Sequence, residues 1–415
     1  MLPLETLPID ERWECSHCGQ CCRNSDIGLD AADLQRLSQQ GWDRHPDTSG
    51  IRVAERAGFL RSRYRLARRT DGRCVFLTEQ GMCRIHQEFG FDAKPLVCRM
   101  YPLQVVPGEQ QLILTLRRSC PTAAADQGDL IHEYRRSVRA AIGQRPGLAE
   151  AGAPPPIVPG LGRDWDDTRR IAGGFARLLS DLRFPLVRRL VHGLQFCELL
   201  EKCQLRPLDS ARLGELVDIL VDAAPEEAGD WFRERRPPRG LARILFRQML
   251  PEYLRLDPRF LVRPSWGQRL RMVRVSTGFA IGRGGVPALL PGFPRPRFDD
   301  LEQRALGPLE PALQGIVTRY YVAQTASQQY VLFGRGGWSL LERYRALALT
   351  YPIAMWMLRY FCEPPGPDEA DVIRAVTAID RGHASAPLAG TQQRRRIAHL
   401  AHLNELQSLC AWYAR

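Results

Sequence analysis

The 415-residue chain has almost no lysine. Only two of its 58 basic residues are lysine, Lys94 and Lys202, and the other 56 are arginine. This bias is typical of a GC-rich genome, and the arginines are spread along the chain instead of forming one basic block. The formal net charge of +12 therefore indicates a general attraction to anions and does not indicate a nucleic-acid partner.

Long apolar runs are also missing. The best one, residues 351–358, stops at Arg359 and is far shorter than the roughly 18–20 residues that span a bilayer. The start of the chain has no basic leader followed by an apolar run, so it does not resemble a secretory signal. We therefore expect a cytoplasmic protein with no membrane partner. Thiols stay reduced in the cytoplasm, which favours metal ligation by cysteine over disulfides.

The chain is rich in cysteine near its start. Residues 15–22 read Cys-Ser-His-Cys-Gly-Gln-Cys-Cys, so four thiols fall within eight residues. Two cysteines separated by two residues can bind one metal, because the chain between them closes a turn around it. Since Cys22 directly follows Cys21, we expect its side chain to point away, toward a second metal, another edge of a cluster or no metal. The eight predicted metal ligands are Cys15, Cys18, Cys21, Cys22, Cys74, Cys83, Cys98 and Cys120.

Two kinds of metal centre fit this set. Eight thiolates can form two zinc sites of four cysteines each. Three cysteines at two-residue intervals with a remote fourth also suit a four-iron, four-sulfur cluster. The adjacent Cys21 and Cys22 are awkward for two closed tetrahedral zinc sites, so we favour an iron–sulfur cluster and keep zinc as the alternative. We expect the nearby His17 and His86 to face solvent or to support the ligands instead of binding metal, because cysteine is plentiful.

The cysteine-rich segment resembles a known family over about residues 11–125. Its motifs are similar to those of the CxxCxxCC zinc- or iron-chelating domain family, the YkgJ-like cysteine-cluster proteins. The matching pieces are the motif at 15–22, Cys74-Val-Phe-Leu, Cys83-Arg-Ile-His and Cys98-Arg-Met-Tyr-Pro. That family includes the flagellin lysine-N-methylases, in which a similar domain precedes a long helical region. Resemblance to that branch, through Leu114-Thr-Leu and Ser119-Cys-Pro, implies transfer of a methyl group from S-adenosylmethionine to a lysine of a protein substrate such as flagellin.

The residues themselves show neither a catalytic base nor a methyl-donor site, so the catalytic residues stay unassigned. The alternative is a protein without catalysis that sequesters or passes on iron or zinc, while its helical region binds a partner. The long helical region favours the enzyme, because a chelating module needs only the first part of the chain. For an enzyme we expect a cleft between the two parts, lined by His17 or His86 and by part of residues 278–285.

The pattern along the chain predicts an α+β protein, with short β-hairpins in a small cysteine-rich domain and a mainly α-helical region after it. Asp30, with Asp33 three residues on, predicts a helix start, and Gly41 its end. Turn residues predict two hairpins, with strands at 74–77 and 82–85 and at 103–106 and 111–117. Residues 42–72 are polar and rich in arginine, and their pattern predicts neither a helix nor a strand.

We divide the chain into a metal-binding domain at 11–125, a helix with a Pro/Gly-rich linker at 126–164, and a mainly helical domain at 165–415. Cys197 lies on an apolar helical face, so we interpret it as a core residue. We expect the isolated Cys203, Cys362 and Cys410 to lie in the core or at the surface. The helical pattern breaks at 263–298, which we interpret as a structural loop. Helices are predicted at about 241–255, 309–332, 339–362, 368–380 and 392–413.

Overall fold

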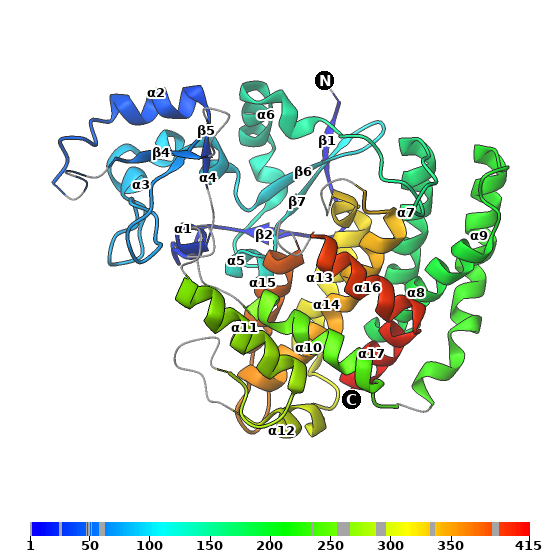
Figure 1. Cartoon of the computed structure of the whole chain (residues 1–415). Coiled ribbons are helices and arrows are strands. Elements are labelled where there is room, and N and C mark those ends of the chain that lie inside the picture. Colours follow the sequence, from blue (N-terminus) through cyan, green and yellow to red (C-terminus); the bar gives the residue numbers. More distant parts are fainter. Residues whose placement is uncertain are drawn as a thin grey trace.

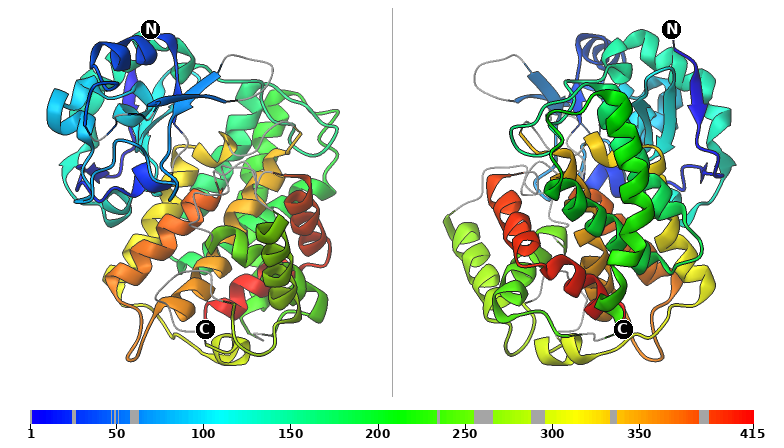
Figure 2. Two further views of the ribbon diagram at one scale, coloured as in Figure 1. Left: turned by 60° about the vertical axis from the view of Figure 1, so that its left-hand side comes forward. Right: turned by 90° about the vertical axis from the view of Figure 1, so that its right-hand side faces the viewer.

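The structure is a computed structural model that describes residues 2–24, 27–46, 48, 50, 52–57, 63–233, 236–254, 266–287, 296–332, 337–383 and 390–415. An N-terminal third with three small sheets lies beside a bundle of helices formed by the rest of the chain (Figure 1). Two further views show the same division, with the N-terminal third at one end of the molecule (Figure 2). The chain is therefore α+β, as predicted.

The largest ladder in the N-terminal third is the predicted second hairpin. Strands β6 (Leu103–Pro107) and β7 (Leu112–Leu116) pair antiparallel, and the backbone N–H of Gly108 closes the turn on the carbonyl of Gln111 at 2.8 Å. Strand β1 (Leu4–Thr6) joins β7 in parallel. Side chains of β7 are buried in a core that also contains α6 (Arg135–Gln144), so this sheet supports the cysteine segments that flank it.

Two further sheets come from stretches that gave no strand prediction. Strand β2 (Arg12–Trp13) pairs with β8 (Asp129–Leu130), and β5 (Arg63–Leu66) lies between β3 (Gly28–Leu29) and β4 (Ala54–Ala57). These strands have two to four residues and many arginines, so they lack the alternation of apolar and polar residues that identifies a half-buried strand.

The first predicted hairpin is correct only in its turn. Thr78 donates its backbone N–H to the carbonyl of Met82 at 2.9 Å, and Leu77 bridges Cys83 in an antiparallel sense. The predicted strand at 82–85 is wrong, because Cys83 is the N-cap of helix α3 (Arg84–Phe89). The pairing is thus a single bridge that redirects the chain into a helix.

The predicted helix start at Asp30 is confirmed by a capping box. Asp30 accepts from the backbone N–H of Asp33 at 2.8 Å, and the Asp33 carboxylate accepts from the backbone N–H of Asp30. Each side chain thus satisfies a backbone donor that the helix itself leaves free. Helix α2 (Ala31–Gln39) ends before Gly41, whose φ of +68° suits glycine.

The helical region is organised around α14 (Leu340–Phe361), whose side chains are buried on every face except at its beginning. A helix buried on all sides is an interior helix. The predicted helices of this region are confirmed, with breaks after Ala326 and at Asn404. The other helices after α6 are α7 (Trp165–Ser180), α8 (Leu186–Lys202), α9 (Ser210–Glu227), α10 (Gly240–Leu254), α11 (Trp266–Ile281), α12 (Phe298–Gln303), α13 (Pro311–Ala326), α15 (Glu369–His383), α16 (Thr391–His402) and α17 (Glu405–Tyr413).

The stretch at 263–298 differs from its prediction, because its described part contains the helix α11. Most of this helix is exposed, including Trp266, Leu270 and Val273, so its apolar residues do not mark one buried face. The glycines that follow it form a structural turn. A Cβ on Gly282, whose φ is +61°, would clash with the guanidinium of Arg247.

The Pro/Gly-rich stretch before α7 packs on the helical region. The carbonyl of Pro156 accepts from the backbone N–H of Leu340 at 2.7 Å, and Ile157 is buried in the helical core. Helix α5 (Pro121–Ala125), which follows Cys120, packs against α13 and α15. The proposed domain boundaries stay a prediction. Within the described ranges, no helix is long and apolar enough to cross a membrane.

Candidate metal centre

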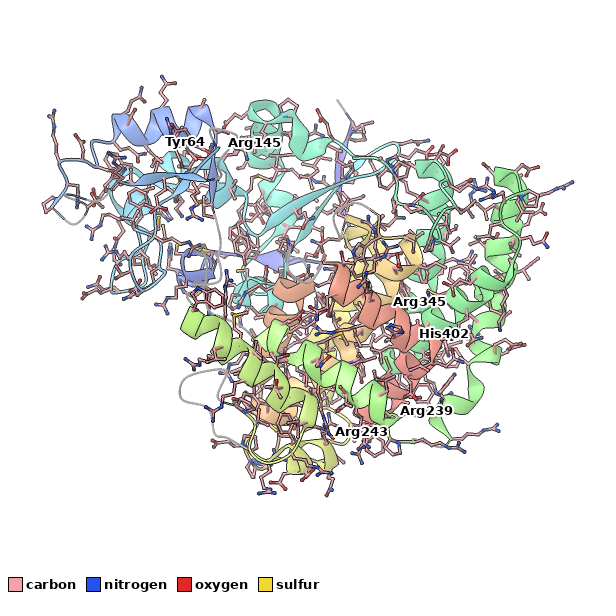
Figure 3. All side chains as sticks on the ribbon, in the orientation of Figure 1. Tyr64, Arg145, Arg239, Arg243, Arg345 and His402 are labelled. Atoms are coloured by element: carbon pink, nitrogen blue, oxygen red, sulfur yellow. The ribbon has the colours of Figure 1, made fainter. Side chains whose placement is uncertain are left out.

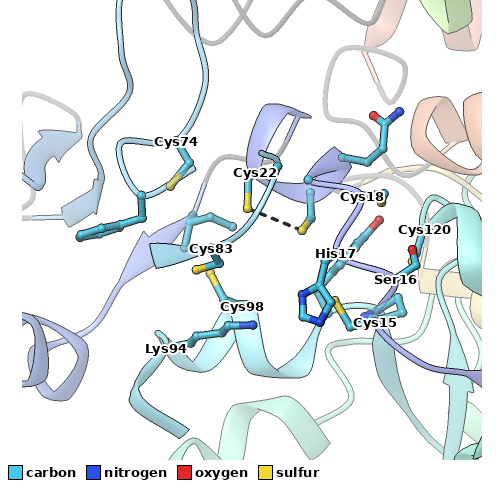
Figure 4. Close-up of a pocket in the computed structure, with 18 of the residues that line it drawn as sticks. Cys15, Ser16, His17, Cys18, Cys22, Cys74, Cys83, Lys94, Cys98 and Cys120 are labelled. Atoms are coloured by element: carbon cyan, nitrogen blue, oxygen red, sulfur yellow. Dashed lines mark hydrogen bonds between the residues drawn. The ribbon is translucent and has the colours of Figure 1, made fainter. Parts of the chain in front are cut away.

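All eight predicted ligands line one cavity of about 150 Å³. Its lining comes entirely from residues between 13 and 122, so the N-terminal third alone builds it. Figure 4 shows Cys22, Cys74, Cys83 and Cys98 on one side and Cys15, Cys18 and Cys120 on the other. The sulfurs thus face one space although Cys15 and Cys120 are 105 residues apart in the sequence.

The CxxCxxCC loop is held against the 78–81 turn. A Cβ on Gly19, whose φ is +67°, would lie 3.1 Å from the carbonyl oxygen of Gly81 and 3.1 Å from Leu77, so glycine allows this close approach. The chain then enters α1 (Gln20–Asn24), where Arg23 donates its backbone N–H to the carbonyl of Gly19 at 3.1 Å. This short helix carries Cys21 and Cys22 into the cavity.

Backbone and side-chain hydrogen bonds fix the other cysteines relative to this loop. Cys74 donates its backbone N–H to the carbonyl of Cys22 at 2.8 Å, which joins two predicted ligands directly. The hydroxyls of Ser16 and Thr122 lie 2.8 Å apart, which joins the loop to the helix that begins after Cys120. Cys98 lies in the short helix α4 (Leu96–Met100), which precedes the β6–β7 hairpin in the sequence.

The expectation that Cys22 points away from Cys21 is wrong. The two sulfurs lie 3.9 Å apart and both line the cavity. In the short helix α1 the two side chains leave the backbone about 100° apart, which lets neighbouring residues border the same cavity. Cys22 and Cys120 both belong to the lining of the cavity.

The cavity is a poor place for free thiolates. Burial raises the pKa of Cys74 to about 11 and raises the pKa of Cys98 well above its ordinary value. A hydrogen bond with Cys22, together with burial, raises the pKa of Cys21 strongly. Thiols with such raised pKa values stay protonated near neutral pH, so a bound cation must displace their protons.

Backbone amides oppose this effect at the sulfurs of Cys83 and Cys120. Burial raises the pKa of Cys83, while the amides of His86 and Ile85 act in the opposite direction. Burial also raises the pKa of Cys120, and there the amides of Ala123 and Thr122 lower it in part. Both cysteines are N-caps, of α3 and α5, so their sulfurs lie at the free backbone N–H groups of a first turn. These donors stabilise the deprotonated sulfur that a metal requires.

The donor set fits a thiophilic metal centre, because thiolates are soft ligands that suit both zinc and iron–sulfur clusters. A tetrahedral zinc ion takes four sulfurs at about 2.3 Å, and an iron–sulfur cluster takes each cysteine on a different iron. Eight cysteines line the cavity, which is enough for either kind of centre.

Of the two imidazoles, only His17 lines the cavity, and its ring lies 5.4 Å from that of His86. The expected involvement of residues 278–285 is wrong, because they do not contribute to this cavity. Cys15 and Cys18 are exposed, so the site is open on the side of the CxxCxxCC loop.

The remaining four cysteines lie outside the cavity. Cys197 and Cys410 are fully buried in the helical core, and the prediction for Cys197 is confirmed. Cys362 is buried at the end of α14, and Cys203 packs at the edge of the core.

The helical region has a second hollow, of about 510 Å³, on the side where Figure 3 labels Arg345 and His402. Its most buried charge is already paired, because Arg345 donates two hydrogen bonds of 2.6 Å each to the carboxylate of Glu201. A bidentate pair of this kind satisfies both groups. The most buried charge of this hollow is therefore satisfied within the protein.

Sequence reasoning missed Lys94 and Tyr101, which also line the cavity. Burial raises the pKa of Tyr101 beyond its usual range, and its hydroxyl lies 3.2 Å from that of Ser119, next to Cys120. Tyr101 lies in the Cys98-Arg-Met-Tyr-Pro motif, but a tyrosine there does not by itself predict a place in the lining of a metal site. Lys94 had a signal, because it is one of only two lysines in the chain.

Comparison with known proteins agrees with this geometry. Residues 14–121 match the model of the CxxCxxCC family, whose description reads "Putative zinc- or iron-chelating domain". Residues 14–121 are thus similar to this family, which confirms the resemblance expected over about residues 11–125. No curated protein and no solved structure matches the chain.

Proposed function

We propose that this chain is an iron–sulfur protein whose cysteine cavity holds its cluster. The observation that carries the proposal is the convergence of eight thiols on one cavity of about 150 Å³. Soft thiolates and a wide ring of donors suit a cluster better than one zinc ion.

The two sides of the cavity suggest how the thiols divide. The two-residue spacing of Cys15, Cys18 and Cys21, with the remote Cys120 as a fourth ligand, suits the cluster. Cys21 also lies 3.9 Å from Cys22 and interacts electrostatically with Cys74, Cys83 and Cys98, so it borders both sets. The opposite side offers a second set of four sulfurs, Cys22, Cys74, Cys83 and Cys98. Thiols of this second set also interact with one another, since Cys74 and Cys83 both raise the pKa of Cys98 beyond the effect of burial. Zinc at both sets is the alternative.

Methyl transfer to a protein such as flagellin, with S-adenosylmethionine as donor, rests on the sequence resemblance alone. The cysteine cavity takes its whole lining from residues 13–122, so the helical region contributes no group to it. A protein that stores or passes on iron or zinc, with its helices binding a partner, needs nothing beyond the cavity. The geometry therefore favours metal binding as the function, with catalysis as a separate proposal.

The test is anaerobic purification followed by visible absorption and by measurement of iron, acid-labile sulfide and zinc. We expect a coloured protein with iron and sulfide in equal amounts. The Cys98→Ser and Cys120→Ser variants should each lose metal, whereas Cys203→Ser, outside the cavity, should keep the wild-type content. A colourless protein that contains zinc alone would show that the cavity binds zinc and not a cluster. A protein without bound metal would refute the proposal.

A second experiment separates catalysis from binding alone. The metal-loaded protein would be incubated with labelled S-adenosylmethionine and with flagellin, and lysine methylation would be followed by mass spectrometry. Methylated lysine that disappears in the Cys120→Ser variant would support the enzyme. Intact metal without any methylation would favour the binding protein for this substrate.

A further inference from the structure

A buried lysine lines the cysteine cavity. Lys94 is only 7% exposed, and Figure 4 shows it reaching into the cavity beside Cys98. A desolvated ammonium is unfavourable unless an anion faces it. The buried Lys94 ammonium therefore requires a negatively charged partner.

The position of Lys94 is set by its backbone on both sides. Its N–H donates to the carbonyl of Phe91 at 3.2 Å, and its own carbonyl accepts from the guanidinium of Arg36 on α2 at 3.2 Å. Pro95 follows and restricts Lys94 to the extended conformation that it adopts, with ψ at 153°. The ammonium lies 5.0 Å from the centre of the Phe91 ring. The side chain is thus aimed at the cavity by a fixed segment.

Lys94 has no carboxylate partner among the described residues. The acidic side chains of adjacent segments bind other cations, since Asp33 pairs with Arg36 at 3.1 Å and Asp92 lies 3.9 Å from Arg99. The groups that Lys94 faces in the cavity are thiols, since Figure 4 shows Cys98 and Cys83 beside it and both line the same cavity. Its natural counter-ion is therefore the thiolate set itself.

We propose that Lys94 is the counter-charge of an anionic four-thiolate metal centre on the Cys83 and Cys98 side of the cavity. Four thiolates around zinc or around a four-iron, four-sulfur cluster leave a net negative charge, which a buried cation stabilises strongly at low dielectric. Lys94 is a positioning residue, since it acts on the metal through the ligands. The inference rests on the proposed function, because it requires that these thiols bind metal.

The test compares three variants of the full-length protein. Lys94→Met keeps the length of the side chain and removes its charge, and Lys94→Arg keeps the charge. Lys202→Met removes the other lysine, which is exposed on α8. Each metal-free protein would be titrated anaerobically with zinc against a competing chelator, and thermal unfolding would be measured with and without zinc.

We expect Lys94→Met to weaken zinc binding by about tenfold or more, Lys94→Arg to restore most of the affinity, and Lys202→Met to match the wild type. In the metal-free state Lys94→Met should be at least as stable as the wild type, because an uncompensated buried charge is gone. If iron–sulfur protein is obtained, the reduction potential of Lys94→Met should be lower, since reduction adds negative charge.

Two outcomes would overturn the inference while leaving the proposed function intact. One is unchanged zinc affinity in Lys94→Met. The other is an equal loss of stability with and without zinc, which would show that Lys94 serves packing alone. A wild-type protein that binds neither zinc nor iron would refute both the inference and the proposed function.

Discussion

The backbone N–H of Ser119 donates to the carboxylate of Asp380 at 2.7 Å, across 261 positions of sequence. Asp380 lies on α15 of the helical region, and Ser119 immediately precedes the predicted ligand Cys120. The same buried carboxylate accepts from the side chains of Arg117 at 3.3 Å and Gln324 at 3.2 Å. A single residue of the helical region thus holds the strand end that presents Cys120.

Replacing Asp380 should therefore weaken both the fold and the metal site. Asp380→Ala leaves the Ser119 amide and the Arg117 guanidinium without their acceptor in a buried position, which should lower the free energy of unfolding by about 3 kcal/mol. Urea unfolding measures the stability, and the rate of metal release to a chelator measures the site. We expect faster release of metal from Asp380→Ala.

A matched control for this variant is Asp218→Ala. Asp218 also pairs with an arginine, Arg177 at 2.6 Å, but its side chain is 64% exposed. Exposed pairs contribute less than about 1 kcal/mol, so the control should unfold and release metal like the wild type. Equal behaviour of the two variants would mean that the buried carboxylate does not link the two regions.

Metal removal should unfold the N-terminal third and spare the helices. This part has small sheets and short helices, and its thiols surround a cavity instead of packing together, so ligation should supply much of its stability. After chelation, or in Cys18→Ser, limited proteolysis followed by mass spectrometry should show cuts within residues 11–125. An unchanged cleavage pattern would contradict this expectation.

The sequence predicted those features that local spacing controls. The cysteine set, the Asp30 helix start and the β6–β7 hairpin follow from residues close together in the chain. The approach of Cys74 to Cys22 follows from the close fit of Gly19 against Gly81, which is a tertiary contact that no local pattern encodes. Lys94 and Asp380 were missed for the same reason, since their importance lies in what distant segments place beside them.

The core of the helical region offers a test that does not depend on metal. Gly193 on α8 faces Tyr344 on α14, whose ring stacks on Phe175 at 4.0 Å. A Cβ on Gly193 would clash with the ring and hydroxyl of Tyr344. Gly193→Ala should therefore lower the free energy of unfolding by at least about 2 kcal/mol, measured by urea unfolding.

The comparison for this variant is Gly173→Ala on α7. No heavy atom lies within 4 Å of a Cβ built at Gly173, so alanine fits there without strain. Because glycine is a poor helix former, this change should stabilise the protein by about 0.5–1 kcal/mol. A neutral Gly193→Ala would show that α8 and α14 do not pack as described, and a destabilised Gly173→Ala would show that α7 lacks the open space found at Gly173.

The last prediction concerns acid stability. His192 on α8 is 3% exposed and packs edge-on against Phe184, with ring centres 4.7 Å apart. Burial lowers the pKa of His192 to about 4, and Arg188 acts in the same direction. The unfolded chain has an ordinary histidine pKa of about 6.5, so it binds a proton that the folded chain excludes as the pH falls through this window.

Stability should therefore be highest above pH 6.5 and decrease toward pH 4, with His192 responsible for roughly 2 kcal/mol of the loss by pH 4.5. His192→Phe, which can keep the contact with Phe184, should reduce that loss, whereas His402→Phe at an exposed position should not. Thermal unfolding of the three proteins from pH 7.5 to 4.5, at constant metal content, measures the difference. The same acid sensitivity in all three proteins would show that folding does not lower the pKa of His192.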